Sequence, residues 1–226
     1  KELRKRLLLK RKRIIHKAYN KADAFKEILQ NRIAQNGSLK YTLVYVPEGN
    51  QPDDASADIF DTSDTIQIDE DTSHLIDQYT SIVRDMDPHL IVRQFTSDST
   101  ERDEMLKEFA NGDIDVLTSM KCLDEGVDVP RSELAIFCSS TGNPRQFIQR
   151  RGRVLRVHPD KRFAIIHDLV VVPDVNYDQD CFELEKSLVE SEIRRVRDFA
   201  LLSANCHETI RELENVLNRY NISIFN

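Results

Sequence analysis

Hydrophobic residues recur along this chain with two periods, and the two periods alternate between residues 40 and 168. Short runs rich in β-branched and aromatic residues predict strands; they cover 41–46, 90–95, 115–118, 134–138 and 163–167. The first and the fourth are expected to be buried. Between these runs, apolar positions three and four residues apart predict helices; these cover about 73–85, 99–111 and 143–157. Such alternation predicts an α/β fold, a parallel sheet flanked by helices on both faces.

The segments on either side of this region are predicted to be helical. Apolar residues at helical spacing indicate one or two helices across about 2–34, ending near Asn36–Gly37. The same spacing over about 180–220 predicts two helices that break near Asn205. We therefore expect three parts: a basic helical connector over 1–35, an α/β domain over 36–175 and a helical extension over 176–226.

Charge is distributed unevenly along the chain. The net charge is −7, yet residues 1–17 hold nine Lys or Arg and one acid, whereas residues 47–82 hold ten acids and no Lys or Arg. An acidic balance argues against a protein that coats nucleic acid, so any such contact must be local. The acidic stretch 48–72 is interpreted as a solvated loop. The basic segment is either a connector with solvated charges or a phosphate contact.

Other composition features limit the class of protein. No apolar run approaches the roughly 18 residues that a membrane span requires, so no membrane partner is expected. The cysteines form no CxxC pair and have no His at metal-ligand spacing, which favours reduced structural thiols in a cytoplasmic protein and no metal site; they are Cys122, Cys138, Cys181 and Cys206. Because the first residue is a Lys inside a helical pattern, we expect a piece of a longer protein.

The segment 144–156, PRQFIQRRGRVLR, concentrates arginines on a predicted helix. Asn143 fits its N-cap and Pro144 its first position. One helical face carries Gln149, Arg153 and Arg156, and the adjoining face carries Ile148, Gly152 and Leu155. Two guanidiniums one turn apart suit a polyphosphate. We expect them at the carboxyl edge of the sheet, where open α/β sheets bind ligands. A solvated basic face is the alternative.

A second segment, 116–130, runs from a predicted strand into the loop DEGVDVP. Gly126 suits a tight backbone position, and Asp128 offers a carboxylate at the same edge. By itself this pattern fits many loops that follow a strand.

Together the two segments resemble motifs V and VI of superfamily-2 helicases, above all the bacterial group that contains type III restriction subunits and related DEAD/DEAH-type helicases. Residues 40–46 resemble the motif IV strand, and 95–118 resemble the segment that leads into motif V. The resemblance covers about 36–172. It implies a RecA-like lobe, the C-terminal one of the two that make a helicase motor.

The resemblance also implies roles for individual residues. Arg153 and Arg156 correspond to arginine fingers for the ATP γ-phosphate, and Gln149 lies near them. Gly126 and Asp128 correspond to residues near the ribose. The expected contacts to the nucleic-acid backbone are Thr118, Ser119 and Lys121. Many members have Thr where this chain has Met120, which puts that one contact in doubt.

The phosphate-cradling half of an ATP site is not found in the sequence. There is no GxxxxGK[ST] pattern and no Gly-Lys dipeptide, and the acidic run at 66–71 comes after the motif IV strand, in the wrong order for a Walker B motif. We therefore expect ATP and Mg²⁺ to be bound mainly by an N-terminal RecA-like lobe of the same protein. The chain alone is predicted to be inactive.

Three functions are compatible with these residues. The first is the second motor lobe of an ATP-dependent helicase or translocase, with DNA rather than RNA as the expected partner. The second is a degenerate RecA-like module that serves protein contacts; the arginine face argues against it, because a scaffold does not need one. The third is a nuclease or methyltransferase domain, which lacks support because no carboxylate cluster or glycine-rich cofactor loop is present. The C-terminal helices are either packed on the sheet or a docking surface.

Overall fold

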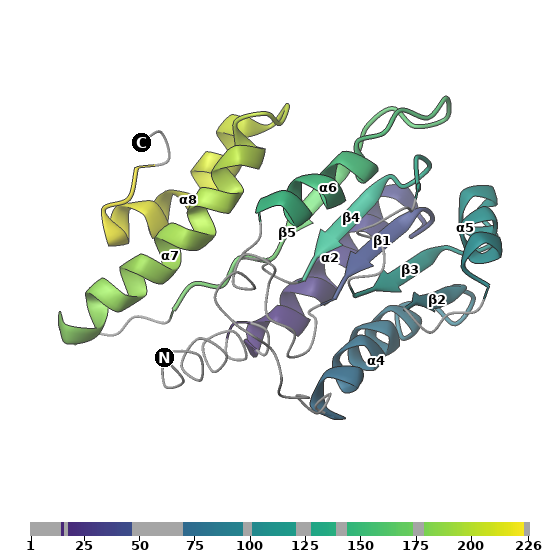
Figure 1. Ribbon diagram of the computed structural model, residues 1–226, viewed down its shortest axis with the longest axis horizontal. Coiled ribbons are helices and arrows are strands. Elements are labelled where there is room, and N and C mark those ends of the chain that lie inside the picture. Colours follow the sequence, from purple (N-terminus) through teal and green to yellow (C-terminus); the bar gives the residue numbers. More distant parts are fainter. Residues whose placement is uncertain are drawn as a thin grey trace, which may run out of the picture. The chain divides into compact units, whose positions relative to one another are not determined.

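The computed structural model describes residues 15, 18–46, 70–96, 101–120, 128–138, 144–173 and 179–223. Its strands are β1 (Thr42–Tyr45), β2 (Val92–Phe95), β3 (Val116–Ser119), β4 (Leu134–Phe137) and β5 (Ile165–Asp168). Its helices are α2 (Asn20–Asn36), α4 (Glu70–Arg84), α5 (Arg102–Asn111), α6 (Pro144–Val154), α7 (Gln179–Ala200) and α8 (Cys206–Tyr220) (Figure 1).

The strands form a sheet in the order β2-β3-β1-β4-β5, and every neighbouring pair is parallel. The predicted α/β class is therefore confirmed. All the predicted strands are present, each displaced by no more than two residues at either end. The three central strands β3, β1 and β4 are buried along their whole length, as expected of a parallel sheet covered on both faces.

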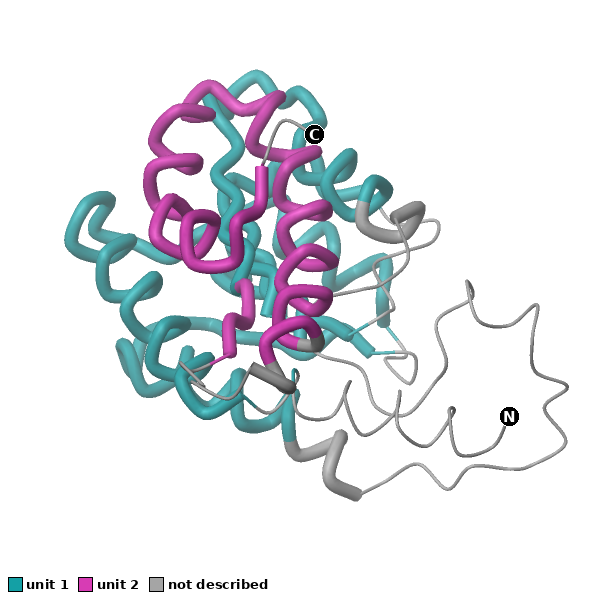
Figure 2. The backbone as a smooth tube through the Cα atoms, turned by 90° about the vertical axis from the view of Figure 1, so that its left-hand side faces the viewer, with its two compact units in different colours: residues 1–169 teal, residues 170–226 magenta. Residues whose placement is uncertain are grey.

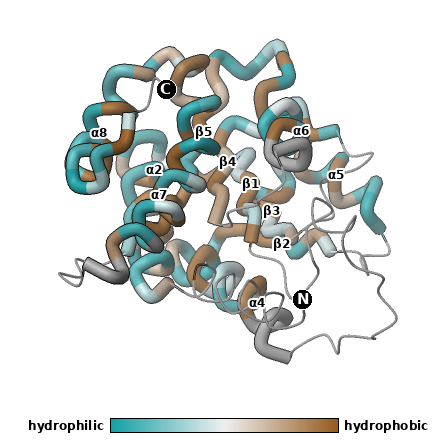
Figure 3. Tube along the Cα trace, turned by 60° about the vertical axis from the view of Figure 1, so that its left-hand side comes forward, coloured by the Kyte–Doolittle hydropathy of each residue, from teal (hydrophilic) through white to brown (hydrophobic). Residues whose placement is uncertain are grey.

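Two hydrophobic layers enclose the sheet. On one face, α2 and α4 pack against alternate strand residues such as Val44 and Ile136, and Phe25 meets Tyr79 edge to face with ring centres 5.0 Å apart. On the other face, Phe109 of α5 and Val154 of α6 pack against the opposite alternation, including Tyr45 and Phe137. Figure 3 shows the hydrophobic stretches concentrated on the strands between these helices.

The helix ends follow the sequence signals in part. Gly37 and Gly112 adopt left-handed conformations at the ends of α2 and α5, as their positions predicted. Pro144 is the first residue of α6, but that helix ends at Val154 rather than near 157. The N-cap position of α5 is Glu101, which forms no side-chain capping bond. Asn143, the predicted N-cap of α6, lies outside the described residues.

One other expectation needs correction. The helix α4 begins at Glu70, so the last residues of the stretch predicted as an acidic loop are helical; residues 47–69 lie outside the description.

Unlike the central strands, β5 has residues that alternate between exposed and half-buried. The reason is its place at the edge of the sheet, beside β4 alone.

The chain divides into two compact units, residues 1–169 and 170–226 (Figure 2). In the second unit α7 and α8 pack through Val189, Ile193, Leu217 and Tyr220. The break between these helices lies at the predicted position, because Asn205 is the N-cap residue of α8. In the described part of the chain, none of the helices combines the length and apolar character that a bilayer crossing requires.

Candidate functional site

The end of α6 meets the turn that precedes β4. Lys161 Nζ donates to the carbonyl oxygen of Pro130 at 2.7 Å and to that of Val154 at 2.9 Å. Arg156, two residues beyond the helix, forms an ion pair with Asp128. Because Asp128 and Pro130 lie just before β4, this meeting point is at the amino edge of the sheet.

The expected placement at the carboxyl edge is therefore wrong for Asp128 and the arginines. The helix α6 begins after the carboxyl end of β4 and runs back along the sheet, as a crossover to a parallel strand must. Its 11 residues rise about 16 Å at the usual 1.5 Å per residue. Arg153 and Arg156 are at its far end, so they arrive at the opposite edge.

The Asp128–Arg156 pair is accessible to solvent. The side chains of Arg156 and Asp128 are 50% and 56% exposed, so water screens their attraction and the pair contributes little to stability. Each group can therefore change partner at small cost. Of the other predicted residues on this helix, Gln149 is exposed and Arg153 is half-buried.

The buried face of α6 differs from the predicted one. Ile148 and Leu155 are 56% and 50% exposed, and a Cβ added at Gly152 meets no atom within 4 Å. The face that carries these three residues is therefore not packed against the rest of the described chain. Instead Val154 and Arg150 are turned inward, and the Arg150 guanidinium lies 5.4 Å from the centre of the Tyr45 ring.

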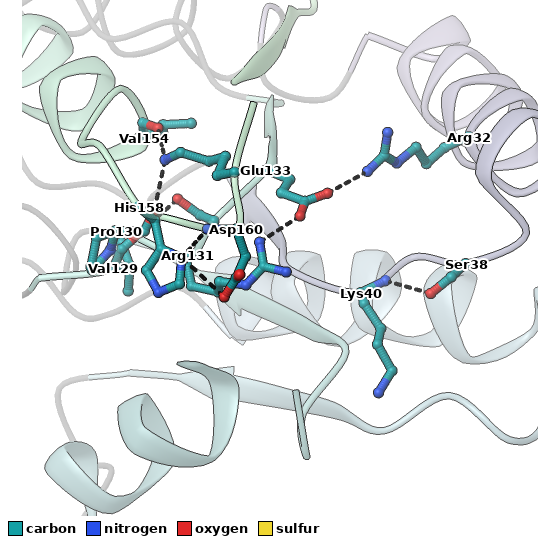
Figure 4. A network of polar contacts seen from close by, with 12 residues as sticks. Arg32, Ser38, Lys40, Val129, Pro130, Arg131, Glu133, Val154, His158 and Asp160 are labelled. Atoms are coloured by element: carbon teal, nitrogen blue, oxygen red, sulfur yellow. Dashed lines mark hydrogen bonds and ion pairs between the residues drawn. The ribbon is translucent and has the colours of Figure 1, made fainter. Parts of the chain in front are cut away.

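A polar network holds the turn that carries Asp128. Val129 is buried, and the Ser132 hydroxyl donates to its carbonyl oxygen at 2.8 Å. Glu133 accepts from Arg131 at 2.6 Å and from Arg32 of α2 at 3.2 Å, with the two guanidiniums on either side of its carboxylate in Figure 4. The Arg131 guanidinium also lies 3.8 Å from the centre of the Tyr41 ring. These contacts tie the turn to β1 and α2.

At the carboxyl edge, the residues predicted to contact nucleic acid are placed differently. The side chains of Thr118 and Ser119 are fully buried. The Thr118 hydroxyl lies 2.8 Å from that of Thr80 in α4, and the Ser119 hydroxyl donates to the Met120 carbonyl oxygen at 3.4 Å. This burial argues against a direct phosphate contact by either hydroxyl. Lys121 and Gly126 lie outside the described residues.

Another buried contact joins α2 to the residue that follows the carboxyl end of β4. Lys21, at the start of α2, is 5% exposed and donates to the carbonyl oxygen of Cys138 at 2.9 Å. Burial raises the pKa of the Cys138 thiol, which keeps it protonated and unreactive. Among the residues that the structure describes, no group of His, Cys, Asp or Glu is arranged to hold a metal ion.

Sequence reasoning missed two residues of this site. Arg150 was not distinguished from its neighbours, although its spacing of four from the apolar Val154 indicated a shared, inward face. Lys161 lies 31 residues from Pro130 in sequence, and no pattern in a single sequence links the two. Only the fold brings them together.

Residues 59–158 match the family described as helicase conserved C-terminal domain. The DNA 3'-5' translocase XPB2 of Sulfurisphaera tokodaii is 40% identical over 83 residues, which is 37% of this chain and 18% of that protein. The putative ATP-dependent helicase IRC3 of Saccharomyces cerevisiae is 35% identical over 77 residues, which is 33% of this chain and 11% of that protein. The chain thus spans a fifth or less of these relatives.

Solved structures are similar at lower identity. The Hef helicase domain of Pyrococcus furiosus has a TM-score of 0.42 and 22% identity, covering 67% of this chain and 26% of that one. Domain 2 of the DEAD-box helicase Mss116p has a TM-score of 0.48 and 14% identity, covering 91% and 76%.

The parallel five-stranded sheet with helices on both faces is the α/β fold that the sequence predicted. The match over 59–158 identifies this part of the chain as a helicase C-terminal domain. The family resemblance drawn from motifs V and VI is confirmed.

Proposed function

We propose that this domain is the second motor lobe of an ATP-dependent nucleic-acid helicase or translocase, and that it supplies arginine fingers to an ATP site completed by another lobe. The observation that carries the proposal is the convergence of Asp128 with the arginine end of α6 at one edge of the sheet. The match covers a fifth or less of the length of each of these relatives. Their remaining length is therefore sufficient for a second lobe that contains a P-loop.

The residues at this edge fit a nucleotide. Arg156 presents a half-exposed guanidinium, whose planar donors suit phosphate oxygens. Arg153 precedes it by one turn, and Gln149 lies one turn further back on the exposed side. Asp128 accepts from the ribose hydroxyls, and Gly126 belongs to the same motif in the sequence. Mg²⁺ would be bound by the other lobe and the phosphates.

The nucleic-acid track belongs at the carboxyl edge, where β3 ends at Ser119. Because the hydroxyls of Thr118 and Ser119 are buried, the contacts come from backbone amides and from the Lys121 side chain. Such contacts bind phosphates without reading sequence. We favour DNA over RNA as the partner, supported by the similarity to a protein named as a DNA translocase.

The experiment is steady-state ATP hydrolysis by the complete two-lobe protein with Arg156→Ala or Arg153→Ala. Loss of a finger is expected to lower kcat by about 10³-fold or more, while nucleotide affinity stays within a few-fold because the other lobe provides most of the binding. Arg162→Ala, which removes an exposed arginine outside the site, is the matched control. Turnover at the wild-type rate in both finger variants would exclude the arginines and leave a scaffold role.

The chain by itself is expected to hydrolyse no ATP, because it contains no P-loop. Purified chain should show no turnover above a buffer blank, with or without single-stranded DNA. Turnover that follows the chain through successive purification steps would contradict this expectation.

A further inference from the structure

Lys161 lies in the turn between α6 and β5, outside the motifs that carry the family resemblance. Its ammonium group donates to Pro130, two residues after Asp128, and to Val154, the last residue of α6. Arg153 immediately precedes Val154, and Arg156 follows it by two residues. One side chain therefore joins the backbone on both sides of the Asp128–Arg156 pair.

We propose that Lys161 is a positioning residue, which fixes the distance between Asp128 and the two arginines by bridging their backbones. This inference rests on the function proposed above. The bridge has a chemical basis on each side. The Val154 carbonyl is at a helix end, where no intrahelical N–H remains to satisfy it. An ammonium group has three donors and can serve both carbonyls at once.

The surroundings of Lys161 define its position. Its own backbone N–H donates to the His158 carbonyl oxygen at 3.0 Å, and the N–H of Asp160 donates to His158 Nδ1 at 3.2 Å. Val129 and Val154 pack in the same hydrophobic cluster. Apolar packing is non-directional and sets only the approximate distance between the turn and the helix. The two hydrogen bonds of Lys161 add the directional constraint.

Stability alone does not explain a cation at this place. Partial burial and the nearby Arg131 lower the pKa of Lys161, and Glu133 offsets this only in part. The chain therefore keeps an ammonium group beside Arg131, which repels it. The free-energy cost of this repulsion is explained if the two hydrogen bonds of Lys161 hold Asp128 and the arginines in position. A displacement of a catalytic group by about 1 Å can lower a rate about 10²-fold.

The first test is ATP hydrolysis by the two-lobe protein with Lys161→Met, Lys161→Arg and the control Arg162→Met. Met keeps the apolar stem but cannot donate, whereas Arg can still bridge two carbonyls. Lys161→Met is expected to lower kcat at least about tenfold, with the KM for ATP changed less than about twofold. Lys161→Arg should recover most of the rate. Arg162→Met, which removes a neighbouring exposed cation, should match the wild type.

The second test needs no ATP hydrolysis and uses the chain itself. Amide hydrogen exchange should accelerate at least about tenfold in 128–132 and 151–156 of Lys161→Met, and remain unchanged in β1. Unchanged exchange in both segments overturns the inference, as does a normal kcat in a folded Lys161→Met protein. A lowered kcat that Lys161→Arg does not recover also overturns it. If exchange accelerates but Arg153→Ala and Arg156→Ala both retain full turnover, the proposed function fails while the Lys161 bridge stands.

Discussion

The guanidinium of Arg150 lies over the Tyr45 ring, which in turn stacks on Phe137 with ring centres 4.7 Å apart. The side chain is only 2% exposed, so its removal leaves both a cavity and groups without their charged partner. We expect Arg150→Ala to lower the free energy of unfolding by about 3 kcal/mol, measured by urea denaturation. Arg162→Ala, at an exposed position, should change it by less than about 0.5 kcal/mol. Equal losses in the two variants would contradict this view of Arg150.

Asp128 shows the opposite balance between stability and function. Its partner Arg156 and its own carboxylate are each about half exposed, so Asp128→Asn is expected to lower the free energy of unfolding by less than about 1 kcal/mol. The remaining difference should disappear in about 1 M salt, where the screening length falls to about 3 Å. Urea denaturation at low and high salt measures both effects. A loss of several kcal/mol that persists in high salt would show that the pair is structural.

At the residue scale, the sequence predicted which residues form the candidate site better than it predicted their location and burial. Arg156 and Asp128 were both predicted to belong to one site, and the structure pairs them. Their edge of the sheet was predicted wrongly, because the position of a residue along a crossover helix decides which edge it reaches. The burial of Thr118 and Arg150 also escaped prediction, since it depends on Thr80 and Tyr45, which lie far away in sequence.

The helix α6 carries a glycine at a site that does not require one. Gly152 is exposed, and a Cβ there meets no atom within 4 Å. We expect Gly152→Ala to raise the free energy of unfolding by about 1 kcal/mol, because alanine is the better helix former. Gly37→Ala is the comparison: its φ of +69° is strained for any residue with a Cβ, so that variant should be less stable. Thermal or urea denaturation of the two variants shows whether each change raises or lowers the free energy of unfolding.

The same substitution also tests function at the level of the helix. If the space above Gly152 admits a nucleotide or the facing lobe, Gly152→Ala raises stability but lowers ATP turnover in the two-lobe protein. Unchanged turnover would mean that the glycine has no role in close approach.

At the element scale, the strands and most helices could be predicted, since each depends on local periodicity. The ends were less predictable. The helix α6 stops at Val154, because the chain there turns toward Lys161 and β5, a tertiary requirement with no local signal. The exposure of β5 follows from its edge position, and strand order cannot be read from the composition of one strand.

For the whole molecule, the main consequence of the fold is that the candidate residues divide between two edges of one sheet. Each strand has four residues, or about 13 Å at 3.3 Å per residue. Asp128 and the arginines lie at the amino edge, whereas Ser119 lies at the carboxyl edge, where β3 ends. Under the proposed function, a nucleotide and a nucleic acid thus bind at opposite ends of the same strands.

This division predicts that the two activities can be separated by mutation. In the two-lobe protein, Arg156→Ala is expected to keep its affinity for single-stranded DNA within about threefold, because the altered residue is a strand length from the track. Lys121→Ala should weaken binding and reduce the slope of log affinity against log salt by about 1, the effect of one lost phosphate contact. Fluorescence anisotropy with labelled DNA over a range of salt concentrations measures both. Lys107→Ala, on the exposed side of α5, controls for net charge. A changed slope in Arg156→Ala, or an unchanged one in Lys121→Ala, would mean that DNA does not follow the carboxyl edge.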